Sequence, residues 1–215
     1  MTKIRFHYSW LLALAAVVTA GSAPARANII LSLTPVSVNA GEVGAHFDVN
    51  VQNTGSIQNL ASFSLALSVS DTRITFTGGN TSTLLPYLFA GDSFDGINGF
   101  PFVTIPPPNG LLVQASDLSD SGAGVAMGTT TLGLGRIFFD VAPNAAPGSI
   151  SVTLVPGCLS ADSCTSMADA NLDAVPFSVS DGRITINGAA GVPEPSTLIV
   201  SLFGVSLLAW RRRRQ

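Results

Sequence analysis

The sequence predicts an all-β fold, a β-sandwich of about nine strands, between two apolar ends. Amphipathic helical patterns are scarce in this middle region, whereas alternation of apolar and polar residues is common. The alternating runs are separated by turns rich in Gly, Pro, Asn, Asp and Ser. No internal repeat of about 20 to 50 residues is visible, which favours a sandwich of the jelly-roll type over a propeller.

The expected strands follow one another along a single domain, residues 28–188. The first is expected to stop before Pro35, because proline has no N–H for a strand ladder. In a later strand Phe63, Leu65 and Leu67 alternate with small polar residues and predict one apolar, inward face. The full set of expected strands is 28–33, 45–51, 63–69, 74–76, 111–115, 134–141, 150–154, 175–179 and 184–186.

The two ends hold most of the basic residues, which leaves the middle acidic. The chain has 10 Lys and Arg and 13 Asp and Glu, but residues 28–192 hold three arginines and 12 acidic residues, a net charge of 3 − 12 = −9. Nucleic-acid phosphates and anionic lipid headgroups are bound by Lys and Arg. The middle region is therefore not expected to bind nucleic acid or to dock on anionic lipid.

The first 27 residues have the organisation of a secretory signal peptide. Lys3 and Arg5 precede an apolar run, 10–20, and Ala25-Arg26-Ala27 supplies the small residues of an A-x-A cleavage site. As a helix this run spans only about 16 Å, less than a bilayer core of about 30 Å. We expect signal peptidase to cleave after Ala27. Cleavage at Ala23-Pro24-Ala25 and a non-cleaved anchor are the alternatives.

The last residues, 189–215, contain three features in a definite order. Pro193-Glu194-Pro195 comes first, a short apolar stretch at about 196–210 follows, and four arginines, 211–214, come near the end. The prolines favour an extended backbone, and the apolar stretch is expected to form a short transmembrane helix. The positive-inside rule places the arginines in the cytoplasm. The precursor is thus predicted to sit in the inner membrane with its middle region outside.

This order of features resembles the PEP-CTERM sorting signal of Gram-negative bacteria. The resemblance implies that an exosortase, a membrane-embedded cysteine protease, recognises Pro193-Glu194-Pro195 and cleaves near it. It also implies that the secretion machinery delivers the mature protein to the outer cell surface or outside the cell. Proteins of this class are linked to exopolysaccharide and biofilm matrix. A plain single-pass anchor is the alternative interpretation of the tail.

Parts of the middle region are similar to the cohesin-like β-sandwich. The first is Val38–Val43, which leads into a strand ending at Val51–Asn53. The second runs through Gly135–Leu154, and Asp181–Ile186 adds a closing strand. Cohesins bind dockerins, and the resemblance implies the sandwich fold. It assigns no residue to a dockerin-binding surface.

The two cysteines are close in sequence. Cys158 and Cys164 bracket five residues of an exported domain, which predicts a disulfide between them. The alternative is a metal site, but such a site would need four ligands and only two are present.

One acidic segment has the D-x-N-x-D spacing of calcium loops, at Asp169, Asn171 and Asp173. Ala174 and Ser180 stand where the EF-hand pattern has Gly and Glu. The segment is either a Ca²⁺ site or a solvated acidic turn, and no other cofactor is expected. Two further acidic stretches, 92–95 and 117–120, are weaker candidates.

Aromatic residues gather in the long stretch between 84 and 109. Exposed aromatic rings could stack on sugars, whereas buried ones would cover the core beneath a loop. The second interpretation is favoured, because phenylalanine has no polar group and both Trp residues lie in the apolar ends. The aromatic residues are Tyr87, Phe89, Phe94, Phe100 and Phe102.

No catalytic constellation is recognisable. His46 is the single histidine of the mature chain, and no nucleophile can be assigned to it. The sequence therefore predicts a protein that is not an enzyme, but a structural or adhesive component of the cell surface or of an exopolysaccharide matrix. The alternative is a secreted carbohydrate-binding or carbohydrate-active protein.

Overall fold

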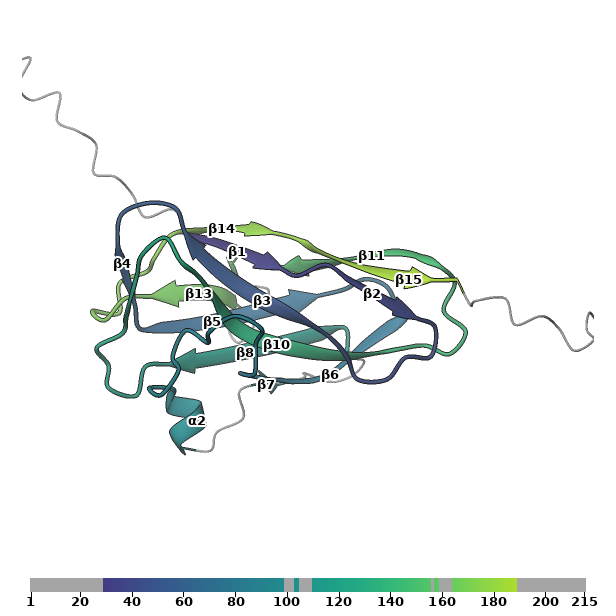
Figure 1. Ribbon diagram of the computed structural model, residues 1–215, viewed down its shortest axis with the longest axis horizontal. Coiled ribbons are helices and arrows are strands. Elements are labelled where there is room, and N and C mark those ends of the chain that lie inside the picture. Colours follow the sequence, from purple (N-terminus) through teal and green to yellow (C-terminus); the bar gives the residue numbers. More distant parts are fainter. Residues whose placement is uncertain (1–28, 99–102, 105–109, 156, 159–163, 189–215) are drawn as a thin grey trace, which may run out of the picture.

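Two β-sheets pack face to face and enclose the hydrophobic core (Figure 1). The structure is a computed structural model, and it describes residues 29–98, 103–104, 110–155, 157–158 and 164–188. The first sheet has five strands in the order β14-β1-β3-β10-β6. The bounds are Phe177–Ser180 for β14, Ile29–Leu33 for β1, Ala45–Asn53 for β3, Thr131–Val141 for β10 and Ile74–Asn80 for β6.

The second sheet is built around β5, which pairs with β8 on one side and with β13 and β11 on the other. β15 and β2 extend the sheet beyond β11, β7 pairs with β8, and β12 pairs with β13. A separate pair, β4 and β9, and one short helix, α2, lie at one end of the sandwich (Figure 1). The bounds are Ser62–Ser68 (β5), Leu112–Leu118 (β8), Cys164–Ala168 (β13), Gly148–Leu154 (β11), Gly182–Asn187 (β15), Val36–Asn39 (β2), Val103–Thr104 (β7), Gly157–Cys158 (β12), Gln58–Leu60 (β4), Val125–Met127 (β9) and Phe94–Asn98 (α2).

Two extended segments pass from one sheet to the other. β1 ends at Leu33, and after Pro35 the chain continues as β2 in the second sheet. In the same way β14 ends at Ser180, and after Asp181 the chain continues as β15. The missing N–H of Pro35 explains why the first strand ends where the sequence predicts. β1 pairs in parallel with β14, and β2 pairs in parallel with β15, so the two segments run together through both sheets.

Alternate strand residues form the core. In β5, Phe63, Leu65 and Leu67 are buried, which confirms the inward face that the alternation predicts. In the space between the sheets, the centroid of the Phe47 ring lies 5.9 Å from that of Phe139 and 6.4 Å from that of Phe76. Burial of apolar surface contributes about 25 cal/mol per Å², so this shared interior is the main source of stability.

All nine predicted strands are present, as β1, β3, β5, β6, β8, β10, β11, β14 and β15. The described residues contain six further strands, β2, β4, β7, β9, β12 and β13. Each of the six is between two and five residues long. Over so few residues alternation is a weak signal, and the sequence pattern missed these six strands although it found β1 and β14, which are equally short.

The helices predicted at the two ends of the chain, in the signal peptide at 1–27 and at about 196–210, lie outside the described residues. Within the part that the structure describes, no helix has both the length and the apolar character needed to cross a bilayer.

The segment between β6 and α2 covers one end of the core with aromatic side chains. Phe89 is fully buried, and its ring stacks on that of Phe63 with 5.8 Å between centroids. The ring of Tyr87 meets Phe89 edge-on at 6.3 Å. For Tyr87 and Phe89 this confirms the core-covering interpretation. Phe100 and Phe102 lie outside the described residues.

Gly133 of β10 allows the same segment to approach the sheet closely. Its N–H donates to the carbonyl of Pro86, and its own carbonyl accepts from the N–H of Leu88, both at 2.8 Å. A Cβ atom at this position would lie 2.2 Å from Oγ1 of Thr83. A larger residue would therefore push the covering segment away from the sheet.

We predict that Phe89→Ala lowers the free energy of unfolding by about 3–5 kcal/mol, because it removes a buried ring and leaves a cavity. Urea denaturation of the exported protein measures this loss. Leu84→Ala is the matched control in the same segment, since Leu84 is 84% exposed, and its effect should stay within about 0.5 kcal/mol. Equal effects of the two substitutions would contradict the core-covering role of Phe89.

Candidate interaction surface

Most site residues predicted from the sequence lie outside the described residues. These are the signal-cleavage positions Ala25 and Ala27, the sorting motif Pro193-Glu194-Pro195 and the arginine cluster 211–214. Their roles therefore stay predictions.

Cys158 of β12 and Cys164 of β13 are paired directly across two antiparallel strands. Opposed residues of such a pair have Cα atoms about 4.5–5.5 Å apart, which is within the range that a disulfide requires. The two side chains lie outside what the structure describes. The disulfide stays a prediction, and the backbone register is compatible with it.

The predicted calcium segment forms the turn between β13 and β14. The Oδ1 atom of Asp169 accepts hydrogen bonds from the N–H of Asn171, at 2.8 Å, and of Asp173, at 3.0 Å. The N–H of Asp169 donates to the carbonyl of Asp173 at 3.0 Å. Asp169 thus has a structural role in closing the turn, and calcium binding stays a prediction. Among the described residues, no three His, Cys, Asp or Glu come together as a possible metal site.

A small uncharged face lies on the outside of the second sheet, near the end that carries α2. In the row across three strands, Ser64 of β5 is paired with Ser166 of β13 and with Ser116 of β8. In the next row Ser62 is paired with Ala168 and Leu118. We call these six residues the serine face.

The serine face follows from strand alternation. The residues between its members, such as Phe63 and Asp117, point inward and are buried, so the members point outward. Ser116 and Ser166 are exposed, and Leu118 is 42% exposed. Three adjacent strands span about 10 Å, and no ionisable group stands in either row. The sequence alone did not reveal this face, because it depends on the registers of β13, β5 and β8.

The carboxylate of Asp117 holds the covering segment against the end of β8. Asp117 is 2% exposed. Its Oδ2 atom accepts hydrogen bonds from the hydroxyls of Tyr87 and Ser93, both at 2.5 Å. Its Oδ1 atom accepts from the N–H of Asp95, at 3.1 Å, and of Leu118, at 2.8 Å. Four donors therefore replace the water that a buried carboxylate would lose.

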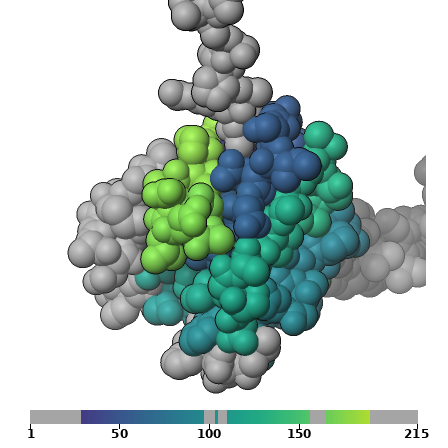
Figure 2. Space-filling model, turned by 90° about the vertical axis from the view of Figure 1, so that its left-hand side faces the viewer, coloured from purple at the N-terminus to yellow at the C-terminus, as the bar shows by residue number. Residues whose placement is uncertain are grey.

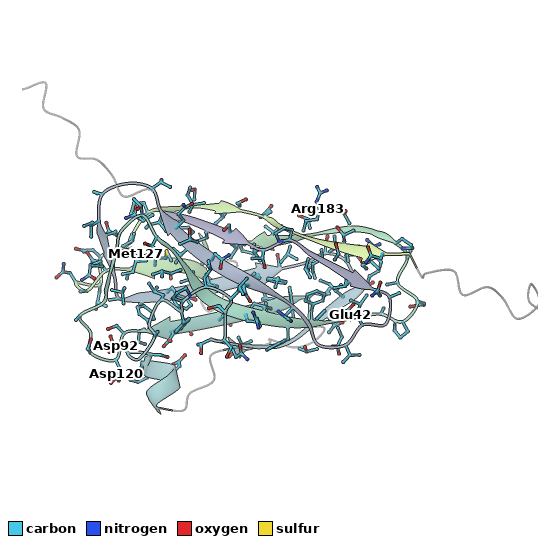
Figure 3. The ribbon with its side chains drawn as sticks, viewed as in Figure 1. Glu42, Asp92, Asp120, Met127 and Arg183 are labelled. Atoms are coloured by element: carbon cyan, nitrogen blue, oxygen red, sulfur yellow. The ribbon has the colours of Figure 1, made fainter. Side chains whose placement is uncertain are left out.

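Asp92 makes the reciprocal contact from the covering segment to the β8–β9 loop. Its Oδ2 atom accepts from the hydroxyl of Ser119 at 2.5 Å and from that of Ser121 at 2.9 Å. Its Oδ1 atom accepts from the N–H of Ser121 at 2.9 Å. The two acidic stretches noted in the sequence, 92–95 and 117–120, are thus brought together, and Figure 3 shows Asp92 beside Asp120 next to α2.

These contacts shift the pKa values of Asp95, Tyr87 and Asp92. Burial, and then the negative charge of Asp117, raises the pKa of the Asp95 carboxyl above its usual range. Burial and the hydrogen bond to Asp117 raise the pKa of Tyr87, so its phenol stays protonated and donates. Hydrogen bonds from Ser119, and then from the N–H of Ser121, lower the pKa of Asp92.

A second buried carboxylate, Asp48, lies on the outer side of the five-stranded sheet. The guanidinium of its cross-strand partner Arg136 binds it through two contacts, Nε to Oδ1 at 2.7 Å and a terminal nitrogen to Oδ2 at 3.1 Å. The N–H of Leu84 also donates to Oδ2, at 2.7 Å. Burial raises the pKa of Asp48, but the bonds from Arg136 and Leu84 outweigh it and lower the pKa overall. This pair ties the covering segment to β3 and β10.

The C-terminal residues 191–215 match the PEP-CTERM protein-sorting motif. This confirms the resemblance of the tail, and the motif indicates an exported, membrane-anchored precursor. The comparison with curated proteins finds no match to the sequence.

The described sandwich is similar in fold to solved cohesins. CaCohA2 from Clostridium acetobutylicum is 17% identical with a TM-score of 0.56, over 77% of this chain and 94% of that one. A type I cohesin–dockerin complex from Clostridium thermocellum contains a chain that is 12% identical with a TM-score of 0.56, over 78% and 98%. A non-cellulosomal cohesin from Archaeoglobus fulgidus is 14% identical with a TM-score of 0.51, over 76% and 93%. At these identities the likeness concerns the fold, and it confirms the cohesin-like sandwich.

The raised pKa of Asp95 predicts a specific pH dependence of stability. The folded state holds the Asp95 proton more tightly than the unfolded state does. Stability therefore rises as the pH falls from neutral through the folded pKa, and this gain is complete below the unfolded value of about 3.9. At lower pH the carboxyls with lowered pKa, Asp48 and Asp92, lose their favourable contacts and stability falls again.

Asp95→Asn should remove the gain on mild acidification and raise stability at neutral pH, because an uncharged group replaces a partly buried carboxylate that Asp117 repels. Urea denaturation across the range from pH 7 to pH 4 measures both effects, with Asp181→Asn at an exposed position as control. An unchanged pH profile in Asp95→Asn would contradict the role assigned to Asp95.

Proposed function

We propose that the chain is the precursor of an exported surface protein, not an enzyme, whose cohesin-like sandwich binds another protein. The PEP-CTERM motif supports the export and sorting, with an exosortase as the processing partner. In this proposal the mature form is a structural or adhesive component of the outer cell surface or of its exopolysaccharide matrix.

The observation that carries the binding proposal is the serine face. Protein interfaces are depleted of charged residues at their centres, and this face is uncharged on a domain whose net charge is strongly negative. Serine hydroxyls can both donate and accept hydrogen bonds, so they can pair with the backbone or side chains of a partner. Solved structures with this fold include type I cohesin–dockerin complexes, which supports a protein partner of that kind.

The alternative carbohydrate-binding function has less support. Tyr87 and Phe89, which could have offered rings to sugars, are packed against Phe63 at the end of the core. The carboxylates of Asp92 and Asp117 accept hydrogen bonds from serine hydroxyls and backbone N–H groups, so neither is a free acid or base for glycoside cleavage.

Sorting predicts a processed mature form. Mass spectrometry of the surface fraction should find a chain that starts at Asn28 and lacks Arg211–Arg214. Replacement of Pro193 and Pro195 by Ala should cause accumulation of the unprocessed precursor in the inner membrane. Full-length chain at the surface with its arginines retained would favour the plain anchor and overturn the sorting proposal.

Binding through the serine face predicts that added charge there releases the protein from the cell surface. Ser116→Arg and Ser166→Arg place charges at the centre of the proposed interface, where they would be desolvated and unpaired. We expect several-fold more mature protein in the medium after washing, measured by immunoblot. Ser180→Arg is the matched control, because Ser180 is exposed on the other sheet. Retention of the face variants at the level of the control would refute this use of the face.

A further inference from the structure

We propose that the α2 end of the sandwich is a second docking surface, and that it binds a protein segment that carries Lys or Arg beside an apolar side chain. This inference does not depend on the serine face. Its central features are two exposed apolar side chains on adjoining turns, Ile57 between β3 and β4 and Leu172 between β13 and β14, which are 75% and 82% exposed.

The turns of this end gather around Ala61. The N–H of Ala61 donates to the carbonyl of Ala168 at 2.9 Å, and its carbonyl accepts from the N–H of Ser119 at 2.8 Å. These bonds join the ends of β13 and β8 across the start of β5. Figure 2, which faces this end, shows the light-green residues of the β13–β14 region directly beside the blue residues around β4 and the teal residues of the loops near β8.

The turn that presents Ile57 is held by a buried amide. Asn53 has no exposed surface. Its Nδ2 atom donates to the carbonyl of Ser56 at 2.7 Å and to that of Met127 at 2.9 Å, and its Oδ1 atom accepts from the N–H of Gly55 at 2.9 Å. An ordered turn of this kind loses little conformational freedom on binding, so the contact energy of Ile57 is largely retained.

The turn that presents Leu172 is ordered in the same way. The N–H of Leu172 donates to the carbonyl of Asp169 at 3.0 Å, within the turn that the Asp169 carboxylate closes. The backbone of Leu172 has φ of +67°, a left-handed conformation that favours Gly or Asn and is uncommon for leucine. An apolar side chain is thus held in water at a position where a small or polar residue would be more stable.

The negative charge of the α2 end favours a cationic partner. Asp169 and Asp173 flank Leu172, and Asp92 and Asp120 lie at the same end beside α2 (Figure 3). Of the described arginines, Arg73 is bound to Asp71 and Arg136 to Asp48, and Arg183 lies on β15, away from this end (Figure 3). A second copy of the acidic end, anionic lipid and nucleic acid would all be repelled, whereas a cationic segment with an apolar side chain would meet both features.

The α2 end also lies far from the end of the domain at which the C-terminal sorting segment begins. β15, whose last residue is Asn187, ends at the opposite end of the sandwich from α2 and β4 (Figure 1). The sorting segment follows Asn187 in sequence, so the α2 end points away from the point at which that segment leaves the domain.

The test uses the exported protein and a synthetic peptide of alternating Lys and Leu as probe, with affinity measured by fluorescence anisotropy. Leu172→Gly should weaken binding about tenfold or more, because it removes a leucine contact. Glycine accepts the left-handed backbone, so the melting temperature should stay equal or rise. Val43→Gly is the matched control, since Val43 is 77% exposed in the loop between β2 and β3. Its affinity should equal that of the wild type.

Two further arms separate the apolar and charged contributions. A peptide of alternating Lys and Ser should bind at least about tenfold more weakly than the Lys–Leu peptide. Asp169→Asn and Asp173→Asn together should lower affinity and its dependence on salt, while the amide oxygen at position 169 can still accept the bonds of the turn. Equal binding of both peptides, or wild-type affinity in Leu172→Gly, would overturn the proposal.

Discussion

The packing of two sheets against one shared core is the constraint on which the rest of the structure depends. Most of the longer strands turn alternate residues toward the core, so the residues in between are available for other purposes. The chain satisfies this constraint by changing sheets at Pro35 and again at Asp181, and the parallel pairs on either side keep both segments in register. The serine face is a direct consequence, because its members alternate with Phe63 and Asp117, which point inward.

One end of the core is covered by the segment between β6 and α2, and carboxylates attach that segment. Asp117 and Asp92 have hydroxyl and backbone donors, whereas Asp48 has a backbone N–H and the guanidinium of Arg136. A buried carboxylate is costly unless such partners replace water. The domain therefore uses several of its acidic residues as acceptors that join segments far apart in sequence, which explains how an acidic, lysine-free body can be well ordered.

The surface of the domain divides into regions of different character. The serine face is uncharged, whereas the α2 end combines the exposed apolar side chains of Ile57 and Leu172 with carboxylates. Two surfaces of different chemistry favour different partners, and specificity is the resulting difference in affinity. In the proposed function, these two surfaces of an exported protein with a C-terminal sorting motif hold other proteins at the cell exterior.

The sequence by itself determined the sandwich, nine of its strands and the sorting motif, because alternation, proline stops and a linear signal are local properties of the chain. The tertiary structure decided the short strands, since β13 exists only through its pairing with β5. It also decided the joining of Asp92 and Asp117 to their serine donors, and the alignment of Ser64 with Ser116 and Ser166. These features depend on register and on contacts between distant segments, which no local pattern encodes.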